Sequence, residues 1–260
     1  MPHSSVAADA GIGYGCRELT QYTEFRDAAA LYARVFRYTE SEYALNTNLL
    51  TALTRNGGSA IGAFDDDGTL IGFAYGFAGC ETDGSVFHYS QAAAVDPEHQ
   101  GRGVGQALKL AQRTVALRWG QRIMRWTFDP LLSRNAHFNL NALGAVGIAF
   151  EPDYYARPDT DRLVVAWDLC AETPAVRRAV PPPPALGRRD WGRAVADDGG
   201  RWIAVPARPD DLAADDRAIL RRDLARTMTD AFQRGEILVA AVRLDEQTAV
   251  YRATPGEGTA

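Results

Sequence analysis

A glycine-rich run near the middle of the chain holds the residue types that point most clearly to a chemistry. It extends from Val95 to Leu108 and contains Gly101, Gly103 and Gly105. The residues before it have the pattern of a buried strand, and those after it the pattern of an amphipathic helix. A tight loop that opens a helix leaves backbone N–H groups without intrahelical partners, and the helix dipole there favours anions. We therefore expect this loop to bind phosphate groups.

The spacing of the glycines separates three kinds of phosphate-binding loop. A P-loop ends in Gly-Lys-Ser/Thr, but Gly105 is followed by Gln106 and Ala107, so the lysine and the magnesium-binding hydroxyl are missing. A dinucleotide-binding loop has the pattern G-x-G-x-x-G near the first strand, and these glycines are spaced differently. The pattern Gln/Arg-x-x-Gly-x-Gly/Ala fits Gln100, Gly103 and Gly105. The alternative is a plain glycine turn that caps a helix, which we disfavour because several positions agree together.

These residues, with Val95–Glu98 before them and Ala107–Leu108 after them, resemble the acyl-CoA loop of the GNAT acyltransferases. The resemblance implies that an amine attacks an acyl thioester directly in a ternary complex, so a nucleophilic serine or cysteine is not expected. It also implies that the loop N–H groups bind the pyrophosphate of acetyl-CoA or another acyl-CoA, with a charge-assisted contact from Arg102. In the family the pantetheine arm lies beside the strand that precedes the loop. The cofactor-binding residues implied by the resemblance are Ala94, Val95, Gln100, Gly101, Arg102, Gly103, Val104, Gly105, Asn135 and Phe138.

A second run, Trp126–Ala145, resembles the strand and helix of a GNAT subgroup of predicted acetyltransferases that carry a C-terminal extension. Asn135 matches the family asparagine that contacts the pantetheine arm or orders the helix start. The run also departs from the general family, whose usual tyrosine, proposed to protonate the leaving thiolate, is replaced here by Leu140. Tyr154 and Tyr155 are the substitutes that the sequence offers just beyond this run.

Several polar residues are candidates for the acid and base of the reaction. Asp129 ends a predicted strand, and as a base it would need a pKa raised by burial. Its structural alternative, which we favour, is to cap the next helix or to hold N–H groups at the turn that follows. Asn135 and Asn139 are one helical turn apart and should share a face, and His88 and Ser90 share a strand face on which they would assist a proton relay. The catalytic candidates are Asp129, Asn139, Tyr154 and His88.

The hydrophobic periodicity predicts the elements that would position these residues. Helices are predicted from Thr20, as N-cap, to Phe36, over 46–55, from the glycine loop onward, and over 133–143. Strands are predicted at 16–19, 59–64, 69–77, 85–95, 122–128, 145–151 and 162–169. This order predicts an α/β (α+β) fold, a mixed and partly antiparallel sheet flanked by helices, and it is also the order of a GNAT domain.

The chain is predicted to have four parts. These are a flexible tail at 1–15, a GNAT acyltransferase domain at 16–170, a Pro-rich linker at 171–199 and a C-terminal subdomain at 200–260. The subdomain should form a strand, a long helix and a hairpin, which is too small to be stable alone. It should pack on the first domain or on a partner subunit, either as a wall or lid of the acceptor site or, as we favour, as a structural or homodimer-forming extension.

Composition narrows the class of protein. The net charge of −5 gives no overall attraction to nucleic acid or to anionic membranes. Cys16, Cys80 and Cys170 form no C-x-x-C pair, which argues against a disulfide framework or a structural zinc site, and we expect no metal. No apolar run reaches the roughly 18 residues of a membrane-spanning helix, and the N-terminus lacks a signal-peptide pattern. We therefore expect a cytoplasmic protein.

The sequence thus predicts an N-acyltransferase that moves an acetyl or acyl group from acyl-CoA to an amine of a small molecule. Two alternatives stay open. In the first, the donor of the acyl or aminoacyl group is a carrier protein or a tRNA. In the second, the protein is a sensor that binds CoA without catalysis.

Overall fold

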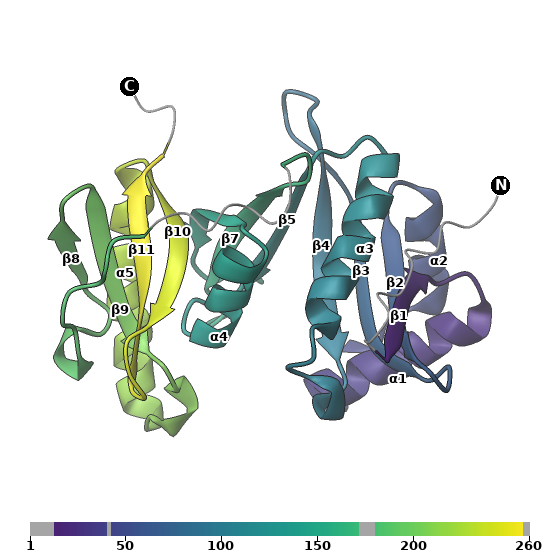
Figure 1. Cartoon of the computed structure of the whole chain (residues 1–260), viewed down its shortest axis with the longest axis horizontal. Helices are drawn as coiled ribbons and strands as arrows, with labels where there is room; N and C mark the ends of the chain where they lie inside the picture. Colours follow the sequence, from purple (N-terminus) through teal and green to yellow (C-terminus); the bar gives the residue numbers. More distant parts are fainter. Residues whose placement is uncertain (1–12, 41–42, 172–179, 257–260) are drawn as a thin grey trace. The chain divides into compact units, whose positions relative to one another are not determined.

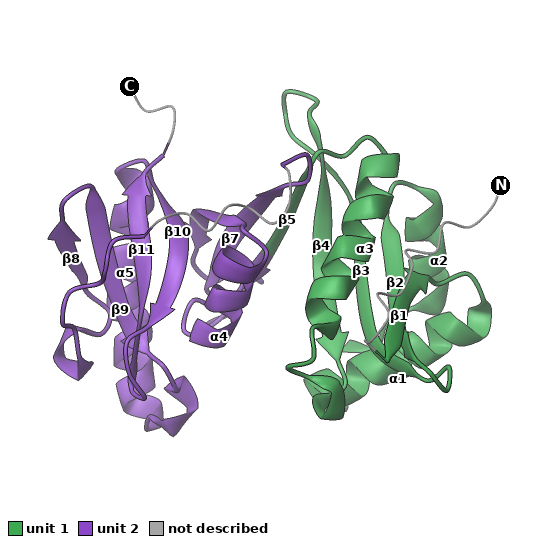
Figure 2. Ribbon diagram, viewed as in Figure 1, with its two compact units in different colours: residues 1–126 green, residues 127–260 purple. Residues whose placement is uncertain are grey.

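The computed structural model describes residues 13–40, 43–171 and 180–256. The chain divides into two compact units, residues 1–126 and 127–260 (Figure 2). Most of the predicted tail and part of the predicted linker, 172–179, lie outside the described residues. No helix in the described ranges combines the length and the apolar character that crossing a membrane would need.

The first unit is built on a sheet whose strands follow the order β1-β2-β3-β4-β5 (Figure 1). Its strands are β1 (Tyr14–Glu18), β2 (Ser59–Asp65), β3 (Leu70–Cys80), β4 (Val86–Val95) and β5 (Ile123–Phe128), the last of which runs across the division between the units. Neighbouring strands are antiparallel except β4 and β5, which are parallel. The predicted mixed sheet is confirmed.

The α-helices described in this unit are α1 (Tyr22–Phe36), α2 (Thr47–Arg55) and α3 (Val104–Arg118). The N-cap of α1 is Gln21 rather than the predicted Thr20. The reason is the carboxylate of Glu24, which accepts the N–H groups of both Thr20 and Gln21, at 2.8 and 3.0 Å. The predicted start of the next helix is confirmed, because Asn46 caps α2 by accepting two backbone N–H groups.

Alternating side chains of β2 and β3 divide the core of the first unit between two faces of the sheet. Phe73 packs with Phe25, Leu31 and Leu50 of α1 and α2. The next residue, Ala74, packs with the apolar face of α3. This α3 face is formed by Val104, Leu108, Ala111 and Val115. Successive strand residues point to opposite faces, so α3 covers the face opposite to α1 and α2 (Figure 1).

The second unit holds a sheet with the strand order β7-β6-β10-β11-β9-β8. Its strands are β6 (Val146–Glu151), β7 (Arg162–Asp168), β8 (Ala194–Asp197), β9 (Gly200–Pro206), β10 (Glu236–Arg243) and β11 (Thr248–Pro255). Its helices are α4 (Ser133–Ala136), which continues as a π-helical turn over His137–Ala142, and α5 (Ala214–Gln233). The predicted C-terminal strand, helix and hairpin are present, and β8 adds a strand where the sequence predicts a linker.

The C-terminal elements continue a sheet rather than forming a separate layer. Leu238 of β10 pairs with Gly147 of β6, and the hairpin of β10 and β11 then pairs with β9. A methyl group at Gly147 would come within 2.9 Å of the Leu238 side chain, so this glycine permits the close approach of the two strands. The domain boundaries predicted from the sequence remain predictions.

Candidate functional site

The glycine loop lies between the end of β4 and the start of α3. The Asp96 side chain accepts the N–H of Glu98 at 3.1 Å, which forms the turn that follows β4. The Gln100 amide then donates to the backbone oxygen of Val95 at 3.2 Å. Gly101 and Gly103 have φ angles of 77° and 85°, in the left-handed region that other residues rarely adopt. Both glycines are therefore needed for the shape of this loop.

The loop presents backbone N–H groups to solvent. None of the hydrogen bonds among the described residues uses the N–H of Gly101, Arg102, Gly103, Val104 or Gly105. All of these except Val104 have exposed or half-exposed surface. The N–H groups stand at the N-terminus of a 15-residue helix, where the helix dipole favours an anion.

The side chains of Tyr14 and Arg102 contribute to the same loop. The hydroxyl of Tyr14 on β1 donates to the backbone oxygen of Arg102 at 3.2 Å, which holds the loop against the sheet. The Arg102 side chain is exposed, and no ion pair within the described part of the chain involves it. Its guanidinium is therefore free to contact a phosphate oxygen.

The strand that leads to the loop separates from its neighbour. The described pairing of β4 with β5 consists of His88 with Met124 and Tyr89 with Arg125. On its other edge β4 pairs with β3, and Gln91 is an additional residue in β4 between two consecutive pairs of this register. It forms a β-bulge. Beyond Tyr89, β4 is paired with β3 but with no second strand in the described ranges. A free strand edge can bind an extended ligand that carries amide groups.

A chain of buried polar side chains lies between the sheet and α3. It begins at Lys109, whose Nζ atom donates to Ser90 Oγ at 2.7 Å, and Ser90 donates to Gln112 Oε1 at 2.7 Å. Gln112 Nε2 donates to Ser59 Oγ at 3.0 Å, and the Ser59 hydroxyl is 2.8 Å from His88 Nε2. Each of these side chains is at most 3% exposed. A β-carbon at Gly76 would lie 2.5 Å from His88 Nε2, so the glycine leaves the room that this chain occupies.

Burial disfavours the charged forms of the two titratable groups of this chain. Desolvation is the main cause that lowers the pKa of His88 to about 4. Desolvation also lowers the pKa of Lys109 to about 7. The amine of Lys109 lies 3.9 Å from the centroid of the Trp126 ring. The predicted common face of His88 and Ser90 is confirmed, since both side chains are buried beside α3.

The remaining catalytic candidates belong to the second unit. Asp129 accepts the N–H of Leu131 at 2.9 Å and forms an ion pair with Arg221 of α5 at 2.7 Å. Both charged groups are largely buried, with 17% and 19% of their side chains exposed. These contacts are the structural role that the sequence favours for Asp129. The catalytic role remains a prediction.

Asn135 and Asn139 differ in burial, and the shared polar face that their spacing predicts stays a prediction. Asn135 is exposed, whereas Asn139 is 4% exposed and Phe138 is half-buried. A π-helical turn begins at His137, between the two residues, and its wider turns displace residues from the positions of an α-helix. Leu140, in the place of the family tyrosine, is buried.

Tyr154 lies in the turn between β6 and β7. Its side chain is 37% exposed, and its ring contacts that of Tyr155 edge to face with centroids 5.0 Å apart. The role of Tyr154 as an acid stays a prediction.

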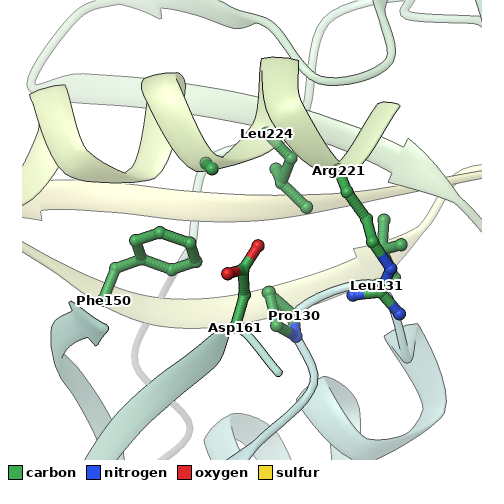
Figure 3. Close-up of a pocket in the computed structure, with 7 residues that line it drawn as sticks. Pro130, Leu131, Phe150, Asp161, Arg221 and Leu224 are labelled. Atoms are coloured by element: carbon green, nitrogen blue, oxygen red, sulfur yellow. The ribbon is translucent and has the colours of Figure 1, made fainter. Parts of the chain in front are cut away.

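A small hollow in the second unit lies beside Asp129. Figure 3 shows Arg221 and Leu224 of α5 projecting toward Pro130 and Asp161. The hollow has no room for a water-sized sphere, so it is a packing gap between α5 and the sheet rather than a substrate pocket.

Residues 20–138, which contain the glycine loop and β4, match the family described as Acetyltransferase (GNAT). This segment belongs to the GNAT acetyltransferase family. The predicted family and fold class are therefore confirmed, and the family carries a transferase activity. No curated protein shows significant similarity to the sequence.

Solved structures with similar folds share little sequence with this chain. The protein yncA from Salmonella typhimurium, solved with its cofactor acetyl-CoA, has 18% identity and a TM-score of 0.49, with 65% of this chain and 99% of that chain covered. Ard1 from Thermoplasma volcanium has 18% identity and a TM-score of 0.47, with 60% and 98% covered. Nourseothricin acetyltransferase has 20% identity and a TM-score of 0.38, with 44% of this chain and 66% of that chain covered.

Sequence reasoning missed the buried polar chain apart from His88 and Ser90. The signal was present in α3, where Lys109 and Gln112 are one turn apart and interrupt the apolar stripe of Leu108, Ala111 and Val115. Polar residues on the buried side of a helix require partners. Lys109 and Gln112 therefore indicate polar partners on the strands that α3 covers.

Proposed function

We propose that this protein transfers an acetyl group from acetyl-CoA to an amine of a small molecule. The loop at Gly101–Gly105 binds the pyrophosphate of the donor, and Arg102 adds a charged contact. The pantetheine arm extends along the free edge of β4, where its amides replace the missing strand. The acceptor amine attacks the thioester in a ternary complex.

The observation that carries this proposal is the set of unpartnered N–H groups in the loop. They combine with the left-handed glycines, the helix N-terminus and the exposed Arg102. A plain helix cap needs neither the arginine nor a free strand edge beside it. The match of residues 20–138 to the GNAT family supports the same assignment.

Calorimetric titration with CoA tests the donor site. Gly103→Glu should abolish binding, because it places a carboxylate at a strained position among the N–H groups. Arg102→Ala should weaken binding by roughly 1.5–3 kcal/mol, the usual contribution of a charge-assisted hydrogen bond. Arg55→Ala is the matched control, since Arg55 is an exposed arginine on α2 and should leave binding unchanged. Wild-type protein that does not bind CoA would contradict the donor assignment.

A second experiment tests the reaction. Acetyl-CoA is mixed with a panel of aminoglycosides, polyamines and amino acids, and products are detected by mass. Acetylation of at least one amine, lost in Gly103→Glu, supports the proposal. If transfer occurs only from an acyl carrier protein or an aminoacyl-tRNA, that molecule, and not acetyl-CoA, is the donor.

The second candidate function is a CoA-binding sensor without catalysis. It is favoured by Leu140, which replaces the family acid with a buried apolar side chain. Binding of CoA without transfer to any amine in the panel would support it over the enzyme.

A further inference from the structure

Lys109 reaches from α3 to the point where β4 and β5 separate. Its Nζ atom is 2.7 Å from Ser90 Oγ on β4 and 3.9 Å from the centroid of the Trp126 ring on β5. Ser90 and Trp126 each follow by one residue the last described pair of these strands, Tyr89 with Arg125. The amine therefore bridges the two strands at the first position beyond their pairing.

Among the described residues, no carboxylate is paired with Lys109. The side chain is 3% exposed, and no ion pair among the described residues includes it. The carboxylates on the adjoining strands have other partners. Glu18 of β1 pairs with Arg118, and Asp65 of β2 accepts N–H groups of its own turn. A buried charge without a partner is costly, so burial favours the neutral amine.

Several titratable groups on the strands around α3 are neutral or paired. Burial lowers the pKa of His88 on β4, and it raises the pKa values of Cys16 and Tyr14 on β1. Arg17 of β1 pairs with Glu24, and Arg125 of β5 pairs with Glu81. Lys109 is therefore a base whose named neighbours are neutral or already paired.

The contacts of a neutral amine leave its lone pair available. A neutral lysine has two N–H groups. One donates to Ser90 Oγ, whose own proton is directed to Gln112 Oε1. The second can point to the face of the Trp126 ring, whose centroid is 3.9 Å from Nζ and whose face attracts N–H groups. The lone pair remains and can accept a proton.

We propose that Lys109 is the base of the acyl transfer and accepts the proton that the attacking amine loses. The amine nitrogen forms a bond to the acyl carbon, the carbon–sulfur bond breaks, and the CoA thiolate leaves. The proton from the amine moves to Nζ of Lys109, which later releases it to solvent, and the thiolate takes a proton from solvent. Ser90 is a positioning residue that holds the amine of Lys109.

This inference rests on the proposed function, which supplies the donor and its direction along β4. Ser90 precedes Val95 by five residues, or roughly 16 Å at the usual rise of a strand. An extended donor that is anchored at the glycine loop and follows β4 therefore ends beside Lys109. The desolvated amine titrates near neutral pH, with a pKa of about 7, which is the range that suits a general base.

The test uses acetyl-CoA and the amine that gives the highest turnover in the panel above. In the wild type, kcat/KM should rise with pH through an apparent pKa near 7. Lys109→Met, which keeps the side-chain length, should lower kcat by about 100-fold or more, leave KM for acetyl-CoA unchanged and abolish this rise. Gln121→Met is the control, because it breaks the same buried chain at its far end, beside His88, and should retain the rise.

The outcomes separate this inference from the proposed function. If Lys109→Met transfers the acetyl group at the wild-type rate and with the wild-type pH profile, Lys109 is not the base, and the proposed transferase activity is unaffected. A wild type that acetylates no amine would overturn both. If Lys109→Met fails to fold, the titration of the Lys109 Nζ in the wild type by ¹⁵N NMR decides, because a midpoint at the ordinary value of 10.5 contradicts the proposal.

Discussion

The Nδ1 atom of His88 lies 2.7 Å from Oε1 of Gln121, and this contact fixes which nitrogen of the ring carries the proton. Gln121 Nε2 donates to the backbone oxygen of Gly57 at 2.8 Å, so the amide oxygen is the atom that faces the ring. Because that oxygen can only accept, Nδ1 must donate. Nε2 then accepts from the Ser59 hydroxyl. The ¹⁵N shifts of His88 should therefore show a neutral ring protonated at Nδ1 at neutral pH.

The neutral His88 makes stability depend on pH in the acid range. Burial lowers the pKa of His88 from 6.5 to about 4 in the folded protein, so the unfolded chain binds a proton that the folded chain does not. Stability should fall as the pH drops from 6.5 to 4, by roughly 3 kcal/mol. Urea unfolding at a series of pH values measures this loss. His137→Gln should keep the wild-type slope because His137 is exposed, whereas an unchanged slope in His88→Gln would contradict the prediction.

Lys109 has a similar effect at higher pH. Its folded pKa of about 7 lies below the ordinary value of 10.5, so between these values the unfolded chain again binds the extra proton. Its contribution should therefore make the protein more stable as the pH rises from 7 toward 10.5. Lys109→Met should remove this slope and be more stable than the wild type at pH 7 and below. Equal slopes for both proteins in urea unfolding would show that Lys109 titrates normally.

The three cysteines should differ in reactivity. Burial raises the pKa of Cys16 to about 11, whereas Cys80 and Cys170 are exposed. Since the thiolate is the reactive form, iodoacetamide at mildly alkaline pH should modify Cys80 and Cys170 first. Peptide mass mapping over time measures the order. Modification of Cys16 at the rate of the other two would contradict its burial beside α3.

Sequence patterns predicted the first unit well because its elements have strong local signals. Asn46 accepts N–H groups of the first turn of α2 as a cap should, and the Asp-Gly turn joins β2 and β3 with Gly68 in the left-handed region. The shape of the glycine loop was predictable for the same reason, because Gly101 and Gly103 adopt the left-handed conformation that glycine favours. Its role in binding the donor stays a prediction.

The buried polar chain could not be predicted in the same way, because its partners are distant in sequence. Lys109 contacts Ser90, and Gln112 contacts Ser59, 53 residues away. The π-helical turn at His137–Ala142 was also not predicted, since the periodicity of this short segment fits an α-helix. This turn begins between the exposed Asn135 and the buried Asn139. The short strand β8 was missed because it follows a Pro-rich segment without alternating apolar residues.

The ion pair of Asp129 with Arg221 allows the two roles of Asp129 to be separated. Asp129→Asn removes the charge from a largely buried pair and weakens the bond to the N–H of Leu131. We expect it to destabilise the protein by about 2 kcal/mol, the usual contribution of hydrogen bonds to charged groups. Arg221→Met should cause a loss of similar size, and the two losses should not add in the double variant. Thermal and urea unfolding measure these changes.

The same variants decide whether Asp129 is also a base. Asp223→Asn is the matched control, because Asp223 pairs with Arg226 on α5 at the surface, and such pairs contribute at most about 1 kcal/mol. If Asp129 has only its structural role, Asp129→Asn and Arg221→Met should lower acetyl transfer equally, and no more than their folded fractions require. A base would behave differently, since Asp129→Asn alone would then lose about 100-fold or more in kcat. We expect the first result, because the carboxylate of Asp129 is already occupied by Arg221 and the N–H of Leu131.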